Sequence, residues 1–162
     1  MSPLEQLQKE LTGLIETSID VRFNFQQVDP GADPVTVHNA MVKAQTLLSA
    51  LENYLSSAIR AKASAERRVA KFRMAHQEKW DRAIVATNKR PTLSEYATGK
   101  EKAAEANLAT LEEARTLRRE EELLSFANEA VDIIRLHYYG LDKIRQDLRK
   151  RLDFAQTDLF NG

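Results

Sequence analysis

The chain has 162 residues, no cysteine, and 24 basic against 24 acidic side chains. The lack of cysteine excludes disulfide cross-links and thiolate chemistry, and no apolar run reaches the roughly 18 to 20 residues of a membrane-spanning helix. The N-terminus lacks the basic and apolar zones of a signal peptide, so we expect a cytoplasmic protein with no membrane association.

The balanced net charge conceals an uneven distribution along the chain. Residues 1–57 carry 3 basic and 7 acidic side chains, residues 58–90 carry 10 and 3, and residues 91–162 carry 11 and 14. The segment charges are therefore −4, +7 and −3. The positive middle segment is the feature most relevant to partners.

Residues 1–33 predict a short N-terminal helix followed by a connector. Ser2 can cap the helix, Pro3 suits its first position, and Glu5 completes a capping box. The connector begins near Val21, where Pro, Gly, Asp and Asn become frequent. An apolar stripe along the helix comprises Leu4, Leu7, Leu11, Leu14 and Ile15.

A second, much longer helix is predicted from about residue 34 to about residue 86. Asp33 is its expected cap, Pro34 its first residue, and no further Gly or Pro occurs before Pro91. At 1.5 Å per residue such a helix would be on the order of 80 Å long. Its heptad-spaced apolar positions are Met41, Ala44, Leu48, Leu51, Leu55, Ala58, Ala65, Val69 and Phe72.

Pro91 should end this helix, and Thr92 with Glu95 offers a capping box for the next. From Lys100 the pattern predicts a helix to about Phe154, interrupted only by Gly140. Residues 34–162 therefore predict a long antiparallel, coiled-coil-like helical hairpin, and the fold class is all-α and oligomeric. The apolar positions of the last helix are Leu108, Leu111, Leu117, Leu124, Ala127, Val131, Ile134, Tyr138, Leu141, Leu148 and Leu152.

No recognised arrangement of catalytic or metal-binding residues is present in the sequence. Nucleotide-binding loops, nucleophile elbows and metalloprotease motifs are missing. The histidines, His38, His76 and His137, are widely separated along the chain. The run Glu120 to Glu122 is interpreted as a solvated acidic face, because consecutive helical residues point in different directions. We predict a protein that is not an enzyme and binds no cofactor and no metal.

The stretch from Ser57 to Trp80 holds most of the positive charge on one predicted helix. If Leu48, Leu55, Val69 and Phe72 face the seam, the row Arg60, Arg67 and Lys71 lies on the opposite face, with Arg68 beside it. Among these cations only Lys62 has an acid four residues later, Glu66, so most lack the usual pairing along a helix. Lys79, Arg82, Lys89 and Arg90 extend the positive potential toward the turn. Such a row either solvates a coiled coil or binds a polyanion.

Two aromatic positions bear on binding to single strands, because bases stack on aromatic rings. Phe72 lies on the apolar stripe and is expected in the core. Trp80, between Lys79 and Arg82, is the better stacking candidate, and packing near the turn is the equal alternative.

Four stretches of the chain resemble the recombination mediator proteins of T-even-type phages (the UvsY-type family). They are "PLEQLQKELTGLIETSID", "RRVAKFR", "LSEYATGKEKA" and "LLSFANEAVDIIRLHYYGLDKIRQDLRK", which occur in the family's order over nearly the whole chain. The last is the most specific. This chain departs from the family in a longer connector, Gln26 to Pro34, and a longer tail, "DFAQTDLFNG".

The resemblance implies a protein that assembles as a ring-like homo-oligomer of roughly six to eight subunits in a phage or bacterial host cell. Such a protein binds single-stranded DNA and helps to load a RecA-like recombinase onto strands coated by single-strand binding protein. The family's DNA-contacting Lys-x-Arg pair corresponds to Lys71 and Arg73. Its oligomer contacts correspond to Ile134, Tyr138, Leu141, Leu148 and Leu152.

The sequence thus leaves two functions from different classes. In the first, single-stranded DNA is bound by the basic stretch, with Arg60, Arg67, Arg68, Lys71, Arg73, Lys79, Trp80 and Arg82 as candidate residues. In the second, the protein is a coiled-coil scaffold or assembly adaptor that binds no nucleic acid and offers its basic face to an acidic protein.

Overall fold

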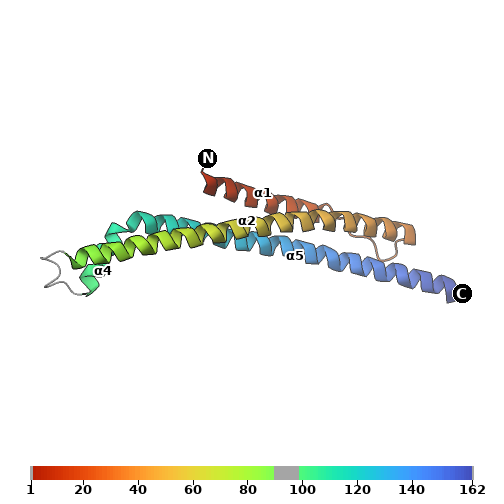
Figure 1. Ribbon diagram of the computed structural model, residues 1–162. Helices are drawn as coiled ribbons and strands as arrows, with labels where there is room; N and C mark the ends of the chain where they lie inside the picture. Colours follow the sequence, from red (N-terminus) through yellow and green to blue (C-terminus); the bar gives the residue numbers. More distant parts are fainter. Residues whose placement is uncertain (1, 90–98, 162) are drawn as a thin grey trace. The chain divides into compact units, whose positions relative to one another are not determined.

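The computed structural model describes residues 2–89 and 99–161, with side chains up to Gln156. Within these ranges the chain forms four helices and no strand, which confirms the all-α prediction (Figure 1). The helices are α1 (Pro3–Phe23), α2 (Pro34–Asn88), α4 (Gly99–Ala109) and α5 (Leu111–Asn161). None of the described helices is long and apolar enough to cross a membrane.

The chain divides into two compact units, which are described separately. Unit 1 consists of Met1–Ala61 together with Ala127–Gly162, and unit 2 of Lys62–Phe126. Unit 1 therefore holds α1, the first half of α2 and the larger, C-terminal part of α5, whereas unit 2 holds the second half of α2, α4 and the start of α5.

Both predicted helix starts in unit 1 are confirmed. The Ser2 hydroxyl accepts a bond of 3.2 Å from the Glu5 amide, and the Glu5 carboxylate accepts one of 2.7 Å from the Ser2 amide. Asp33 caps α2 by accepting bonds from the amides of Val35, at 2.9 Å, and Thr36, at 3.0 Å. α1 extends to Phe23, three residues into the predicted connector.

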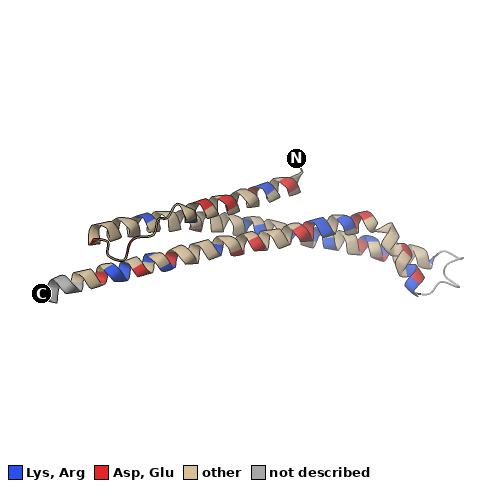
Figure 2. Ribbon diagram, turned by 180° about the vertical axis from the view of Figure 1, so that it is seen from behind, with Lys and Arg blue, Asp and Glu red and all other residues tan. Residues whose placement is uncertain are grey.

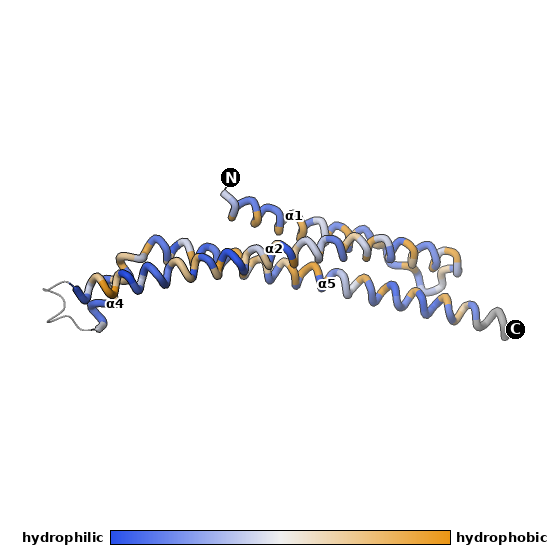
Figure 3. The backbone as a smooth tube through the Cα atoms, viewed as in Figure 1, coloured by the Kyte–Doolittle hydropathy of each residue, from blue (hydrophilic) through white to orange (hydrophobic). Residues whose placement is uncertain are grey.

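Unit 1 is built around an apolar core that joins its three helical segments. The α2 side chains Ala44, Leu48 and Leu51 pack with Leu141 and Leu148 of α5. The connector contributes Phe25, which is buried, and α1 contributes Val21, which packs against the same cluster. Hydrophobic residues recur along each of these segments, as amphipathic helices require (Figure 3).

Unit 2 has a thin core made mostly of small side chains. Its buried residues on α2 are Ala65, Val69 and Thr87, and those later in the chain are Ala106, Thr110, Glu120 and Leu123. Small residues bury little apolar area, so this unit gains less from the hydrophobic effect than unit 1. Charged residues follow one another closely along its helices (Figure 2).

The predicted last helix is interrupted at Thr110, which separates α4 from α5. The Thr110 hydroxyl donates to the Ala106 carbonyl oxygen at 2.9 Å, and both residues are buried. Leu108 and Leu111, two of the apolar positions of the predicted last helix, are 73% and 42% exposed. Ala106 and Thr110, four residues apart, take the inward positions at this point. The predicted turn and capping box at Pro91, Thr92 and Glu95 lie outside the described residues.

Candidate nucleic-acid interface

One face of α2 in unit 2 is exposed along its whole length and is predominantly basic. Its members recur every three or four residues, so they share one side of the helix. We call this face the outward stripe. It comprises Arg67, Lys71, Met74, Glu78, Arg82, Val85 and, directly after the last residue of α2, Lys89, all of which are exposed.

Four of the seven stripe residues are cations and one is an acid. Glu78 lies 3.8 Å from Arg82, a contact between two highly exposed side chains that adds little energy. Arg67, Lys71 and Lys89 make no recorded side-chain hydrogen bond or ion pair within the described part of the chain. The stripe therefore keeps most of its positive charge available to a partner.

Three other predicted cations are engaged by acids of α5 in the same unit. Arg68 donates two bonds to the Glu120 carboxylate, at 2.8 and 2.6 Å, and the Glu120 side chain is only 3% exposed. Glu120 accordingly raises the pKa of Arg68 by hydrogen bonding and by charge, against the cost of burial. The interpretation of Glu120 as a solvated acid was wrong, because it is the buried partner of Arg68.

The pairs made by Arg73 and Lys79 lie nearer the surface. Arg73 contacts Glu121 at 2.7 Å and is 65% exposed, so a phosphate could compete for it. Lys79 pairs with Glu113, and the hydrogen bond from Lys79 lowers the pKa of that carboxyl. One oxygen of Glu113 is buried with no hydrogen-bond partner among the described residues.

Trp80 packs at the contact between α2 and α4. It is half-buried, and its indole nitrogen donates to the side-chain oxygen of Asn107 at 3.2 Å. Phe72 is also half-buried, on the side of the predicted seam. Of the two uses that the sequence left open for Trp80, this geometry fits packing near the turn.

Arg60 lies in unit 1 and is exposed, with no recorded partner in the described residues. The residues assigned to oligomer contacts lie in unit 1 as well. Ile134, Leu141 and Leu148 are buried within the chain, and Tyr138 and Leu152 are half-buried. The α5 side chains Leu136 and Tyr139 are instead strongly exposed, although the resemblance did not single them out.

The structure thus separates the basic residues of the sequence into two sets. Arg67, Lys71 and Arg82 lie on the outward stripe, whereas Arg68, Arg73 and Lys79 face acids of α5. Sequence reasoning gave Lys89 as part of the positive potential near the turn but not as a candidate DNA-binding residue, and it missed all three acidic partners. Part of their signal was present, because Glu113 and Glu120 are seven residues apart, the spacing of one helix face.

No group of three or more potential metal ligands occurs among residues 2–89 and 99–156. Comparison of the chain with protein-family models, with curated proteins and with solved structures gave no match in any of the three.

Proposed function

We propose that the protein binds single-stranded DNA through the outward stripe and acts, without enzymatic activity, as a recombination mediator. The observation that carries the proposal is that Arg67, Lys71 and Lys89 lie on one exposed face, and that no acid among the described residues is paired with them. A strand that neutralises these charges releases its condensed counterions, which favours binding.

The stripe also offers apolar surface between its cations. Val85 and Ala86 line a shallow hollow that is rimmed by Arg82, Lys89 and Asp81. Phosphates need cations and unstacked bases need apolar surface, so the two kinds of residue together suit a single strand better than a duplex.

The proposal includes a hairpin arrangement of α2 with α4 and α5. In unit 2, Arg68 pairs with Glu120, Lys79 with Glu113, and Trp80 with Asn107. Partners late in α2 thus come early in the following helices, which is the order expected for antiparallel neighbours. Assembly into a ring would repeat the stripe around the oligomer, so that weak contacts of single subunits act together.

The role in recombination rests on the resemblance described above. By that resemblance the protein would help a RecA-like recombinase to replace single-strand binding protein on the strand. The stripe would supply the affinity for DNA, and other surfaces would contact the two proteins.

A coiled-coil scaffold is the second candidate, and the acids of α5 favour it. Glu113, Glu120 and Glu121 already engage part of the basic stretch, so charge within unit 2 also serves the packing of its own helices. A scaffold whose basic residues are engaged in this way would have no need to bind a nucleic acid.

Light scattering separates the two candidates. The molar mass of the protein is measured alone and with a short oligo(dT) strand at low salt. A DNA-binding mediator gives an oligomer whose mass rises by that of bound strand, whereas a scaffold gives an oligomer of unchanged mass. Unchanged mass at low salt would refute the proposed function.

A further inference from the structure

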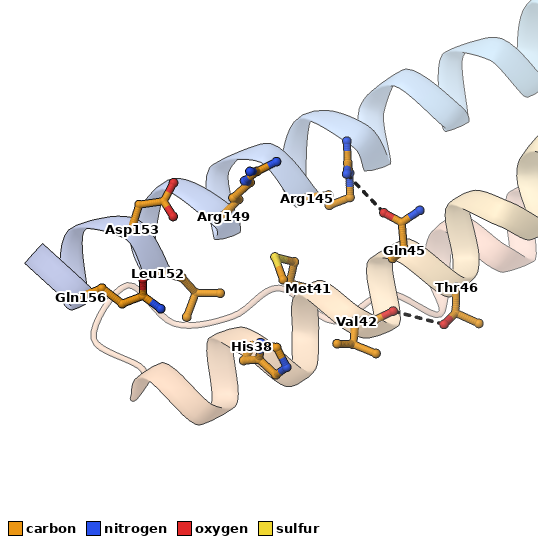
Figure 4. A pocket seen from close by; sticks show the side chains of 10 residues that line it. All are labelled: His38, Met41, Val42, Gln45, Thr46, Arg145, Arg149, Leu152, Asp153 and Gln156. Carbon is orange, nitrogen blue, oxygen red and sulfur yellow. Dashed lines mark hydrogen bonds between the residues drawn. The ribbon is translucent and has the colours of Figure 1, made fainter.

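Unit 1 contains an open groove between the beginning of α2 and the end of α5 (Figure 4). Its volume is about 540 Å³. The groove is lined on α2 by His38, Met41, Val42, Gln45 and Thr46, and on α5 by Arg145, Arg149, Leu152, Asp153 and Gln156.

The lining residues recur at helical spacing on both walls. On α2 they run from His38 to Thr46, which at 1.5 Å per residue is roughly 12 Å, or a little over two turns. On α5 they run from Arg145 to Gln156, about three turns. A groove between two neighbouring helices with this repeat accommodates the side-chain ridge of a third helix.

The floor of the groove is apolar. Met41 and Leu152 lie between the two helices in Figure 4, and both are half-buried against the core of unit 1. Val42 lines the same groove and is 50% exposed. An apolar side chain placed here by a partner would cover surface that unit 1 leaves open to water.

The α5 wall carries two guanidinium groups. Arg145 is held in place by Asp142, with bonds of 3.0 and 2.7 Å, and by Gln45 across the groove at 3.2 Å. Arg149 is exposed and makes no recorded contact within the described residues. Asp153 is the one acid of the lining, and it is engaged in an interaction of its own. Of the two guanidinium groups, that of Arg149 is therefore the one without a recorded partner among the described residues, and it lies beside an apolar floor.

We infer that this groove binds an acidic amphipathic helix of a partner protein. Apolar side chains of that helix would rest on Met41, Val42 and Leu152, and its carboxylates would face Arg149 and the outer edge of Arg145. Guanidinium groups bind carboxylates through two parallel hydrogen bonds, which gives such a contact direction as well as charge. The helical repeat of both walls favours a helix over an extended nucleic acid strand as the occupant.

This site is independent of the outward stripe, because its residues belong to unit 1 and those of the stripe to unit 2. A negative result for peptide binding in the groove would therefore leave the proposal of DNA binding on the stripe intact. A negative result for DNA binding would likewise leave the proposed peptide site intact.

The test uses the full chain and a fluorescein-labelled Leu/Glu peptide of about three helical turns, with Leu on one face and Glu beside it. Two comparison peptides replace Glu by Lys, or Leu by Ser. Binding is followed by fluorescence anisotropy for the wild type, for Arg149→Glu and for Val42→Gln. Lys150→Glu is the charge control, because it lies on the same helix but outside the groove, and Ile59→Gln is the apolar control.

We expect the Leu/Glu peptide to bind in preference to both comparison peptides. Arg149→Glu should weaken binding by roughly tenfold or more, equal to about 1.4 kcal/mol, and Val42→Gln by several-fold. The two control variants should stay within about twofold of the wild type, a difference of less than about 0.5 kcal/mol. Absence of binding, equal binding of the Ser-substituted peptide, or equal losses for Arg149→Glu and Lys150→Glu would each overturn the inference.

Discussion

The guanidinium of Arg68 forms a two-point ion pair with the carboxylate of Glu120, and this pair joins α2 to α5 within unit 2. Glu120 is almost fully buried, whereas Arg68 remains 27% exposed. Because a buried carboxylate without its partner is costly, Arg68→Met should lower the free energy of unfolding by about 3 kcal/mol.

The double variant Arg68→Met with Glu120→Leu should recover most of that loss, since it leaves no unpaired buried charge. Urea unfolding followed by circular dichroism, as a double-mutant cycle, measures both effects. A double variant as unstable as Arg68→Met would contradict this explanation, because the loss of stability would then not come from an unpaired buried carboxylate.

Sequence reasoning predicted the elements of this fold well, because the signals involved are local. The caps at Ser2 and Asp33 and the apolar repeat through Leu48, Leu51 and Val69 depend only on neighbouring residues. The interruption at Thr110 was not predictable, because threonine is tolerated inside helices and its inward position depends on packing within unit 2.

Sequence reasoning predicted which basic residues make up the candidate site, but not which of them are paired with acids. Periodicity correctly put Arg67 and Lys71 on an exposed face. It did not reveal which cations meet acids more than 30 residues away, as in the contact of Lys79 with Glu113, separated by 34 positions. Such pairs depend on the register between two helices, which heptad patterns leave open.

Acidification should destabilise unit 1 through His137. Burial, together with the charge of Arg22 in α1, lowers the pKa of His137 below its ordinary value of 6.5. As the pH falls below that value the unfolded chain takes up a proton that the folded chain refuses, so the free energy of unfolding decreases. The decrease ends once the pH passes below the folded pKa.

Urea titrations between about pH 7.5 and pH 5.5 measure this dependence. His137→Gln should flatten the slope, and Arg22→Gln should flatten it partly because it removes the smaller of the two causes. An unchanged slope in His137→Gln would assign the effect to another group.

Gly140→Ala should stabilise the protein by about 1 kcal/mol, because glycine inside a helix costs roughly that much relative to alanine. A Cβ at Gly140 would have as its nearest neighbour the Nε atom of Arg22 at 3.8 Å, an ordinary van der Waals distance. Gly13→Ala in α1 is the matched control, with nothing within 4 Å of the added carbon. Thermal unfolding of both variants checks the prediction, and a loss of stability specific to Gly140→Ala would contradict it.

Trp80 should respond little to a bound strand, because its ring packs between α2 and α4 and its indole nitrogen is bonded to Asn107. The chain has a single tryptophan, so tryptophan fluorescence, excited selectively over that of the tyrosines, reports on Trp80 alone. Saturating oligo(dT) should leave its emission largely unquenched, and Trp80→Phe should change affinity for the strand less than about twofold. Strong quenching would instead identify Trp80 as a stacking residue.

The central claim is that the outward stripe, and not the cations paired with α5, holds single-stranded DNA. The most direct test is the anisotropy of labelled oligo(dT), measured against salt concentration, for the double variant Arg67→Gln with Lys71→Gln. The control is Arg115→Gln with Arg118→Gln, which removes the same charge from unit 2 at exposed positions already paired with Glu112 and Glu122. We predict that the stripe variant loses about tenfold in affinity and about 1.4 in the slope of log affinity against log salt, and that the control keeps both. Equal losses in the two variants, or none in the stripe variant, would contradict the account.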